Sequence, residues 1–420
     1  MAFVDRLPPA LQHRDFRIYF LGSIATTAGS QFTTVVLYWQ MWAITQSWTW
    51  MMWLGLSRAA AQIGLALVGG LLADSLDRRR FMIAMQLMQA AASLALFVLA
   101  IGDLISPWAL MIGNLVFAVG SALETPARQA VVVNLVPRAD FPSAVALNNV
   151  GRNASPAVGS SLAGLLFAAA GPSWCYLIDG LSWFIMIGVL ISIRATLQSE
   201  RRSSVSFGAL ADGVRFVRGQ RVILSFMVMD FGANFFGTAT SLLPIYAADI
   251  LKVGPTGFGL LNAAPSVGQV VTGVIMGSTN RIRRAGKWVI LGVAFYGACI
   301  CGFALSSSFV FSLLMLAGTG VGNGISAVLR STSNNLLTPD DLRGRVAAVN
   351  SVFTGGGPQL GQFEGALVAD LFGPVASAFS GGVGVLVLVA LIALVPEVRR
   401  FDLTAAIRAL DGPVAPPGRR

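Results

Sequence analysis

The chain consists mainly of long apolar runs that are separated by short polar segments. A helix needs about 20 predominantly apolar residues to cross the hydrocarbon core of a bilayer, so each run predicts a membrane-spanning helix. The runs fall into two sets: 16–44, 49–73, 81–102, 108–133, 143–170 and 174–194, then 222–250, 257–279, 286–306, 309–335, 345–371 and 374–396. This pattern predicts an all-α membrane protein with twelve transmembrane helices in two six-helix bundles.

The positions of the basic residues predict how the chain is oriented. Almost every Arg and Lys lies near the chain ends or in every second gap between the runs, and Lys252 is the exception in the other gaps. Loops rich in Arg and Lys stay on the cytoplasmic side of a membrane, so both termini are expected in the cytoplasm. The first 15 residues contain no apolar stretch of the kind found in a secretory signal peptide.

Composition excludes several classes of protein. Charged residues make up 11% of the chain and hydrophobic residues 55%, whereas ordinary soluble domains are about 25% charged, which excludes a cytosolic enzyme. The net charge of +10 lies in the gaps, so we expect no nucleic acid partner. Three cysteines in apolar runs and a single histidine argue against disulfides, a histidine metal site and a catalytic triad. The motif G-x-x-x-x-G-K-S/T does not occur, so neither ATP hydrolysis nor a cofactor is expected.

The two sets of runs are related as an internal repeat. A shift of 202 residues pairs Pro137 with Pro339, Asn148 with Asn350, Pro156 with Pro358 and Gly159 with Gly361. We expect a first bundle at 1–194, a cytoplasmic linker at 195–221, a second bundle at 222–397 and a disordered cytoplasmic tail at 398–420. This layout is typical of transporters whose binding site lies between two repeats.

Residues 70–80, with the sequence GLLADSLDRRR, resemble motif A of the major facilitator superfamily. Segments at 126–130, 134–140, 146–148, 155–157 and 344–346 are similar to the branch that includes the enterobactin exporter, macrolide efflux pumps and transmembrane secretion effectors. The resemblance covers residues 10–397. It implies the major facilitator fold and transport by alternating access, in which the two bundles rock about a central site.

The resemblance also implies moving parts and a cavity. The cytoplasmic gate would consist of Gly70, Asp74, Arg78 and Arg79. In it, Asp74 would meet a helix N-terminus or an arginine of the other half when the inner side is closed. A hinge in the fifth span would consist of Arg152, Pro156 and Gly159, with Ser155 standing where the family has a glycine linked to export. The first, fourth, seventh and tenth spans would line the central cavity.

Polar residues inside the runs are the candidate functional residues, because an ionisable side chain in mid-membrane costs about 2.5–3.5 kcal/mol. The candidates for proton coupling are Glu124, Asp230 and Glu364. Polar lines at helical spacing, on the four spans named above, supply the candidates for cavity or substrate contacts: Gln31, Thr34, Tyr38, Arg128, Asn234, Thr238, Asn323 and Arg330.

Structural alternatives stay open for these residues. Glu124 and Arg128 lie four residues apart and can form an ion pair that has no part in transport. The polar lines can also join helices by hydrogen bonds. Arg58 can extend to the outer side and pair with Asp103 or Asp249. Asp179 is expected near the outer end of the sixth span, exposed to water.

The sequence therefore favours a secondary active transporter in the cytoplasmic (inner) membrane of a bacterium. We expect a monomer whose partners are a small-molecule substrate, protons and the lipid bilayer. The favoured function is proton-driven export of an amphiphilic small molecule such as a siderophore or a drug. Two alternatives remain: a lysophospholipid or nutrient transporter of the same fold, and a membrane scaffold or sensor that transports nothing.

Overall fold

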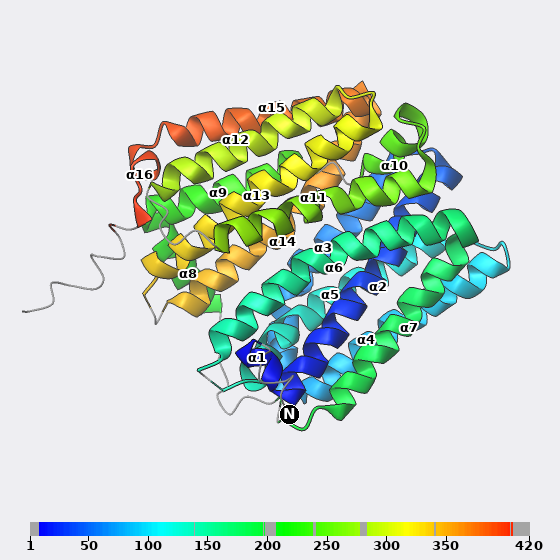
Figure 1. The fold of residues 1–420 in the computed structure, drawn as a ribbon, viewed down its shortest axis with the longest axis horizontal. Coiled ribbons are helices and arrows are strands. Elements are labelled where there is room, and N and C mark those ends of the chain that lie inside the picture. Colours follow the sequence, from blue (N-terminus) through cyan, green and yellow to red (C-terminus); the bar gives the residue numbers. More distant parts are fainter. Residues whose placement is uncertain are drawn as a thin grey trace, which may run out of the picture.

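The computed structural model describes residues 8–137, 139–195, 197, 207–237, 241–277, 284–339, 342–403 and 405, and their regular structure is all helical (Figure 1). A short helix α1 (Pro9–Gln12) precedes the first long helices. These are α2 (Arg14–Thr45), α3 (Trp48–Ser75), α4 (Arg78–Ile101), α5 (Pro107–Asn134), α6 (Phe141–Ala170) and α7 (Pro172–Ser192). Each coincides, within a few residues at its ends, with one apolar run of the first half.

The second half repeats this arrangement after helix α8 (Phe207–Gly219). Its elements are α9 (Arg221–Gly237), α10 (Leu243–Ile245), the π-helix η2 (Tyr246–Ile250), α11 (Gly254–Gly277), α12 (Ala285–Ala304), α13 (Phe309–Leu337), α14 (Arg343–Phe372), α15 (Pro374–Ala393) and α16 (Pro396–Arg399). The run predicted at 222–250 contains α9, α10 and η2, and residues 238–240 within it lie outside the described ranges. Pro244 has no backbone N–H and stands in the first turn of α10, a position that tolerates this loss.

The same turn recurs in both halves. Gly171 (φ +86°) separates α6 from α7, and Gly373 (φ +87°) separates α14 from α15, 202 residues later. A positive φ favours glycine, which has no Cβ to clash with the backbone. Pro172 and Pro374 follow these glycines and begin the next helix, because proline is pre-set for the first helical position. The two halves therefore have the same turn at equivalent positions, as the internal repeat predicts.

Seven helices of the described residues are long and apolar enough to cross a membrane. They are α4, α5, α7, α11, α12, α13 and α15. Helix α2 is also long, but the polar residues along it lower its mean hydropathy, and α9 has only 17 residues. Seven of the twelve predicted spans thus meet the requirements of length and composition, and the number of twelve spans stays a prediction.

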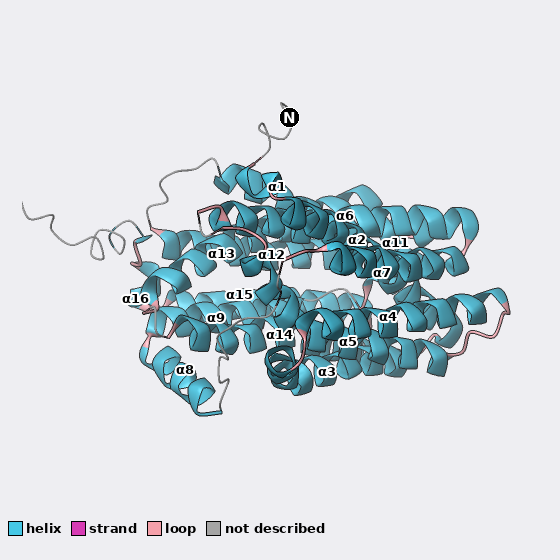
Figure 2. Ribbon diagram, turned by 90° about the horizontal axis from the view of Figure 1, so that it is seen from below, coloured by secondary structure: helices cyan, strands magenta, loops and turns pink. Residues whose placement is uncertain are grey.

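The helices pack as two bundles that meet along two pairs of helices. Helices α2–α7 pack on one another, as do α9 and α11–α15, while α3 packs against α14 and α6 against α11 across the boundary (Figures 1 and 2). Helices α1, α8 and α16 lie at one end of the molecule, here called the terminal end, and α10 lies at the other, the far end (Figure 1).

A buried apolar cluster joins the bundles at the far end. This far-end core includes Val36, Met41, Met51, Tyr176, Leu243, Tyr246, Phe258 and Phe303. The other buried clusters of the described residues each belong to one half of the chain. Burial of apolar surface therefore holds the bundles together at the far end and leaves them less tightly joined at the terminal end.

Two glycines allow α6 and α11 to touch at their backbones. A Cβ atom added to Gly259 would lie 2.7 Å from Gly164 Cα and 2.6 Å from Ser160 O. No side chain fits such a space without moving the helices apart. Gly273, on the same helix α11, has open space around its Cβ position.

We expect Gly259→Ala to destabilise the protein by about 1–3 kcal/mol, because it overpacks the contact between the bundles. Gly273→Ala is the matched control and should leave the stability unchanged or slightly raised, since alanine favours the helix. The measurement is the thermal unfolding temperature of the purified variants in detergent. Equal unfolding temperatures for the two variants would show that the helices do not meet at Gly259.

Candidate functional site

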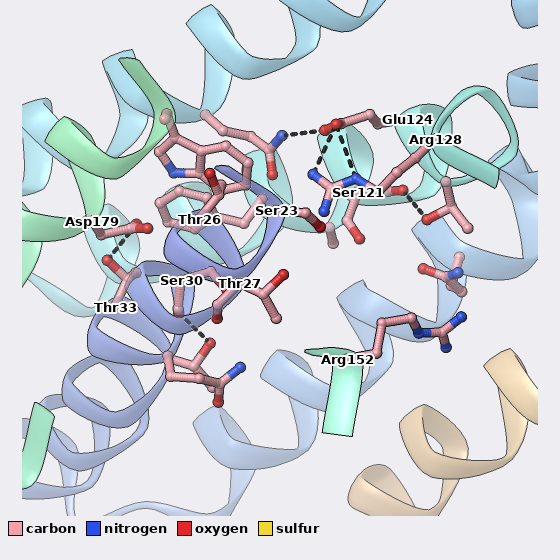
Figure 3. A pocket seen from close by; sticks show the side chains of 18 of the residues that line it. Ser23, Thr26, Thr27, Ser30, Thr33, Ser121, Glu124, Arg128, Arg152 and Asp179 are labelled. Carbon is pink, nitrogen blue, oxygen red and sulfur yellow. Dashed lines mark hydrogen bonds and ion pairs between the residues drawn. The ribbon is translucent and has the colours of Figure 1, made fainter. Parts of the chain in front are cut away.

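A cavity of about 430 Å³ lies in the first bundle, between the far-end core and the terminal end (Figure 3). This first cavity is lined by residues of α2–α7 and by Gln359 of α14. Helix α2 contributes a face of hydroxyl and amide side chains: Thr26, Thr27, Ser30, Gln31, Thr33 and Thr34. Residues three and four apart lie on the same face of a helix, which explains why the polar line of the first span forms one wall.

Glu124 lies in the wall of this cavity and is held by three side chains. Its Oε1 accepts hydrogen bonds from Arg128 Nη2 at 2.8 Å and Gln86 Nε2 at 2.9 Å, and its Oε2 accepts one from Gln89 Nε2 at 3.3 Å. The carboxylate is buried, with a fractional exposure of 2%. Its charge is therefore compensated by an arginine one turn away on the same helix, α5.

Asp179 lies in the same cavity wall, and its predicted exposure to water is wrong. The residue is 1% exposed, because α7 turns it inward between α2 and α4. Its Oδ2 accepts a hydrogen bond from Thr33 Oγ1 at 2.7 Å and lies 2.9 Å from Ser93 Oγ. Its Oδ1 is buried and has no hydrogen-bond partner. The sequence signal was a carboxylate in an otherwise apolar run, with Trp183 one turn later.

Two arginines of the cavity wall have no carboxylate partner among the described residues. Arg58 lies over the ring of Tyr38, with its Cζ 5.9 Å from the ring centroid, and Arg152 of α6 is exposed to the cavity (Figure 3). The predicted pairing of Arg58 with Asp103 or Asp249 is not seen, and Asp249 accepts a hydrogen bond from Trp42 Nε1 at 3.2 Å instead.

Tyr38 does not line the cavity. It is buried in the far-end core, and its hydroxyl donates a 2.5 Å hydrogen bond to Gln362 Oε1 of α14. Together with the bond between Trp42 and Asp249, this contact connects the two bundles at the far end. Tyr38 therefore belongs to the closed end of the molecule in this conformation.

A second, smaller cavity of about 260 Å³ lies in the second bundle, among α9, α13 and α14. Asp230 and Arg330 lie in its wall and form an ion pair of 2.5 Å between α9 and α13. Asn234 Nδ2 also donates to Asp230 Oδ1 at 3.1 Å. The four polar lines of the sequence thus contribute to two cavities, with α2 and α5 in the first and α9 and α13 in the second.

The remaining candidates lie elsewhere. Glu364 is partly buried on α14 and lines neither cavity, and Asn323 of α13 likewise lines neither. Thr238 lies outside the described residues. The candidates that the structure brings together in the first cavity are Gln31, Thr34, Glu124, Arg128 and Arg152.

Of the predicted gate, the structure describes the arginines. Arg79 Nη2 donates to the carbonyl oxygens of Ile193 and Ala195 at 2.7 and 3.1 Å, and Arg78 Nη1 donates to Leu197 O at 3.3 Å. These contacts fix the segment after α7, where cations are favourable at the helix C-terminus. The side chain of Asp74, and the surroundings of Gly70, lie outside the described part of the chain.

The predicted hinge lies where α6 crosses α2. A Cβ atom on Gly159 would lie 2.8 Å from Ala28 Cα, so glycine allows the two helices to approach closely. Pro156 stands inside α6 and removes a backbone hydrogen bond from it. The role of these residues in movement stays a prediction.

The described residues contain no group of three or more His, Cys, Asp or Glu side chains that could hold a metal ion. The charged groups of the two cavities are carboxylates and arginines. Such groups can bind a proton or a polar small molecule.

Comparisons with known sequences point to one family. The sequence model of a family described as transmembrane secretion effector matches residues 7–415. The enterobactin exporter EntS of Escherichia coli O157:H7 is 25% identical over 407 residues, which cover 95% of this chain and 96% of that protein. The enterobactin exporter EntS of Shigella boydii serotype 18 is 25% identical over 398 residues, covering 93% and 94%.

Comparisons with solved structures show the fold. A POT family transporter in complex with a thioalcohol conjugated peptide aligns with a TM-score of 0.73 at 13% identity, covering 94% of this chain and 99% of that chain. A bacterial homolog of the human lysosomal transporter Spinster aligns with a TM-score of 0.66 at 11% identity, covering 98% and 100%. The arrangement of helices is therefore that of major facilitator transporters.

The buried ion pair in the second cavity can be tested through the stability of the protein. We expect Arg330→Met to destabilise the protein by about 3–5 kcal/mol, because it leaves the Asp230 carboxylate buried without its cation. Adding Asp230→Asn to Arg330→Met should recover most of the loss. Thermal unfolding of the purified variants measures both effects.

Arg221→Met is the control, because Arg221 forms an exposed ion pair with Glu397 at 2.6 Å. Water screens this pair, so its loss should barely change the unfolding temperature. An Arg330→Met variant as stable as Arg221→Met would contradict the buried pairing.

Proposed function

Because the chain belongs to the transmembrane secretion effector family, we propose that it is a proton-driven exporter of an amphiphilic small molecule such as a siderophore or a drug. Its relatives and its fold are those of integral membrane transporters, which are not enzymes. One observation carries the proposal: a polar cavity of about 430 Å³ lies behind an apolar core that closes one end of the molecule. Binding sites for small molecules commonly have about 300–1,000 Å³.

The basic residues indicate which side of the membrane the terminal end faces. Loops rich in Arg and Lys support a cytoplasmic position for both termini and hence for the terminal end, in the inner membrane of a bacterium. The first cavity would then load its cargo from the cytoplasm. The compared Spinster homolog is described as inward-facing and unoccupied, which agrees with this assignment. Release would need the far-end core to separate.

The cavity wall indicates the chemistry of the cargo. Arg58 and Arg152 offer charged donors to acceptor oxygens, and the hydroxyls of α2 both donate and accept. Phe117 and Trp183 add aromatic surface. An oxygen-rich molecule with hydroxyl groups and an aromatic part fits this wall, and the curated relatives are named enterobactin exporters. A scaffold or sensor that transports nothing would need no such cavity.

Protons would drive export by re-entering the cell in exchange for cargo. The coupling roles of Glu124, Asp230 and Glu364 stay predictions. Glu124 and Asp230 are each paired with an arginine, and Glu364 lines neither cavity. The protein would act as a monomer, with the bilayer, protons and the cargo as its partners.

The test uses enterobactin as the probe in inside-out membrane vesicles that contain the full chain. Respiration acidifies the vesicle interior, so the protein should accumulate enterobactin inside, and a protonophore should abolish the accumulation. Accumulation that survives the protonophore would overturn proton coupling. Absence of enterobactin accumulation would remove this cargo.

Arg58→Gln and Arg152→Gln should each reduce the initial rate of accumulation about tenfold, because each removes one charged hydrogen bond to the cargo, which is worth about 1.5 kcal/mol. Arg218→Gln is the control, because Arg218 is exposed on α8 and is not among the residues that line the cavity. Wild-type rates in both cavity variants would show that the cargo does not pass through the first cavity.

A further inference from the structure

Asp179 differs from the other buried carboxylates in the chemistry of its partners. It lies on α7, in the wall of the first cavity, and contacts Thr33 of α2 (Figure 3). It also contacts Ser93 of α4. Both partners are hydroxyl groups. No cation lies within ion-pair distance of it among the described residues, although it is 1% exposed. A buried carboxylate with neutral partners is costly in its charged form.

The charged and titratable groups around it lie further off. Tyr176 precedes it on α7, and the cavity wall adds Arg58 from α3, Glu124 and Arg128 from α5, and Arg152 from α6. From α2 and α4, the groups that face Asp179 are the hydroxyls of Thr33 and Ser93. Arg128 is engaged with Glu124, so its charge is already compensated.

Ser93 allows Asp179 to be held in either protonation state. Its Oγ lies 2.9 Å from Asp179 Oδ2 and 2.8 Å from the carbonyl oxygen of Tyr176, and it has only one hydrogen to donate. When Asp179 is charged, Ser93 can donate to Oδ2. When Oδ2 carries a proton, it can donate that proton to Ser93 Oγ, while Ser93 donates to Tyr176 O.

Glu124 is held as a charged group instead. All of its hydrogen-bond partners are N–H donors, from Gln86, Gln89 and Arg128, and an arginine cannot accept a proton. A proton on Glu124 would break the ion pair and leave Arg128 without its carboxylate. Asp230 is restricted in the same way by Arg330. Of these three buried carboxylates, Asp179 can change its charge at the lowest cost.

A second observation points to a ligand at the same place. Asp179 Oδ1, an acceptor, and Trp183 Nε1, a donor, are both buried and make no hydrogen bond of regular geometry, although the indole N–H lies near enough to act on the carboxylate. They lie one turn apart on α7, and both residues line the first cavity. Buried polar groups normally have well-formed partners, so this donor and acceptor, which interact with each other only weakly, can both be satisfied by one hydroxyl group, which donates and accepts.

We propose that Asp179 is the carboxylate at which a proton and a hydroxyl group of the cargo compete, with Trp183 Nε1 as the second contact for that hydroxyl. This inference rests on the proposed function and assigns its coupling site. In the outward-open state a proton from external water forms an O–H bond at Asp179 Oδ2, and the neutral acid becomes a weaker acceptor for the cargo. In the inward-open state the proton returns to cytoplasmic water, and the cargo hydroxyl donates to the charged carboxylate at Oδ1.

The first test measures protonation without transport. The purified full chain in lipid nanodiscs is acidified stepwise, and infrared difference spectra record the carbonyl stretch of protonated carboxyl groups. Wild type, Glu124→Gln and the conservative Asp179→Glu should show this band on acidification, whereas Asp179→Asn should lose it. Persistence of the full band in Asp179→Asn would overturn the proposal, as would its loss in Glu124→Gln alone.

The second test measures coupling, with enterobactin as the probe in the same inside-out vesicles. Asp179→Asn should lose accumulation driven by the pH gradient and keep exchange of internal for external enterobactin, which needs no net proton movement. Gradient-driven accumulation at the wild-type level in Asp179→Asn would overturn the coupling role. If wild type moves no enterobactin, the proposed cargo fails, and the infrared band still decides whether Asp179 holds the proton.

The Trp183 contact has its own test. Trp183→Phe keeps the aromatic ring and removes the N–H donor. It should weaken enterobactin exchange and leave the infrared band in place. Unchanged exchange would remove Trp183 from the site, and loss of the band would mean that Trp183 acts on Asp179 itself.

Discussion

Apolar packing at the far end is the interaction on which the rest of the structure depends. The buried cluster that draws on both halves of the described chain lies there, and each remaining cluster belongs to one half. Hydrophobic burial is not directional. The two bundles can therefore separate and come together again at this contact without having to restore a specific set of hydrogen bonds. Two hydrogen bonds, Tyr38 with Gln362 and Trp42 with Asp249, fix how the two bundles are aligned at this contact. The cavities lie where no comparable packing joins the bundles.

The charged groups inside the helices are compensated in different ways, and this difference separates structure from function. Arg128 and Arg330 each neutralise a carboxylate, which lowers the cost of burying both charges and stiffens the surroundings. Within the described part of the chain, Asp179 accepts hydrogen bonds from hydroxyl groups and faces no cation, and Arg58 and Arg152 have no carboxylate partner. Groups that the fold leaves partly unsatisfied are the ones that can still respond to a proton or a ligand.

Much of the fold could be predicted from the sequence because lipid forces the backbone to satisfy its own hydrogen bonds. Long apolar runs then become helices, and their bounds agree with the structure for α2–α7 and α11–α15. The site was harder to predict. Helical spacing shows which residues share a face, such as Gln31 and Thr34, but it does not show how the helix is rotated. Asp179 was therefore placed in water, and Tyr38 in the cavity, although neighbouring helices bury both.

The repeat leaves an arginine at matching places in the two halves, since Arg128 and Arg330 are 202 residues apart. Their acidic partners come from different sources. Glu124 stands on the same helix as Arg128, whereas Asp230 stands on α9 and Arg330 on α13. A pair within one helix survives any rigid displacement of that helix, but a pair between two helices breaks when they slide apart. In the first half, the ion pair therefore persists when helices slide past one another. In the second half, the ion pair must break before α9 and α13 can move apart.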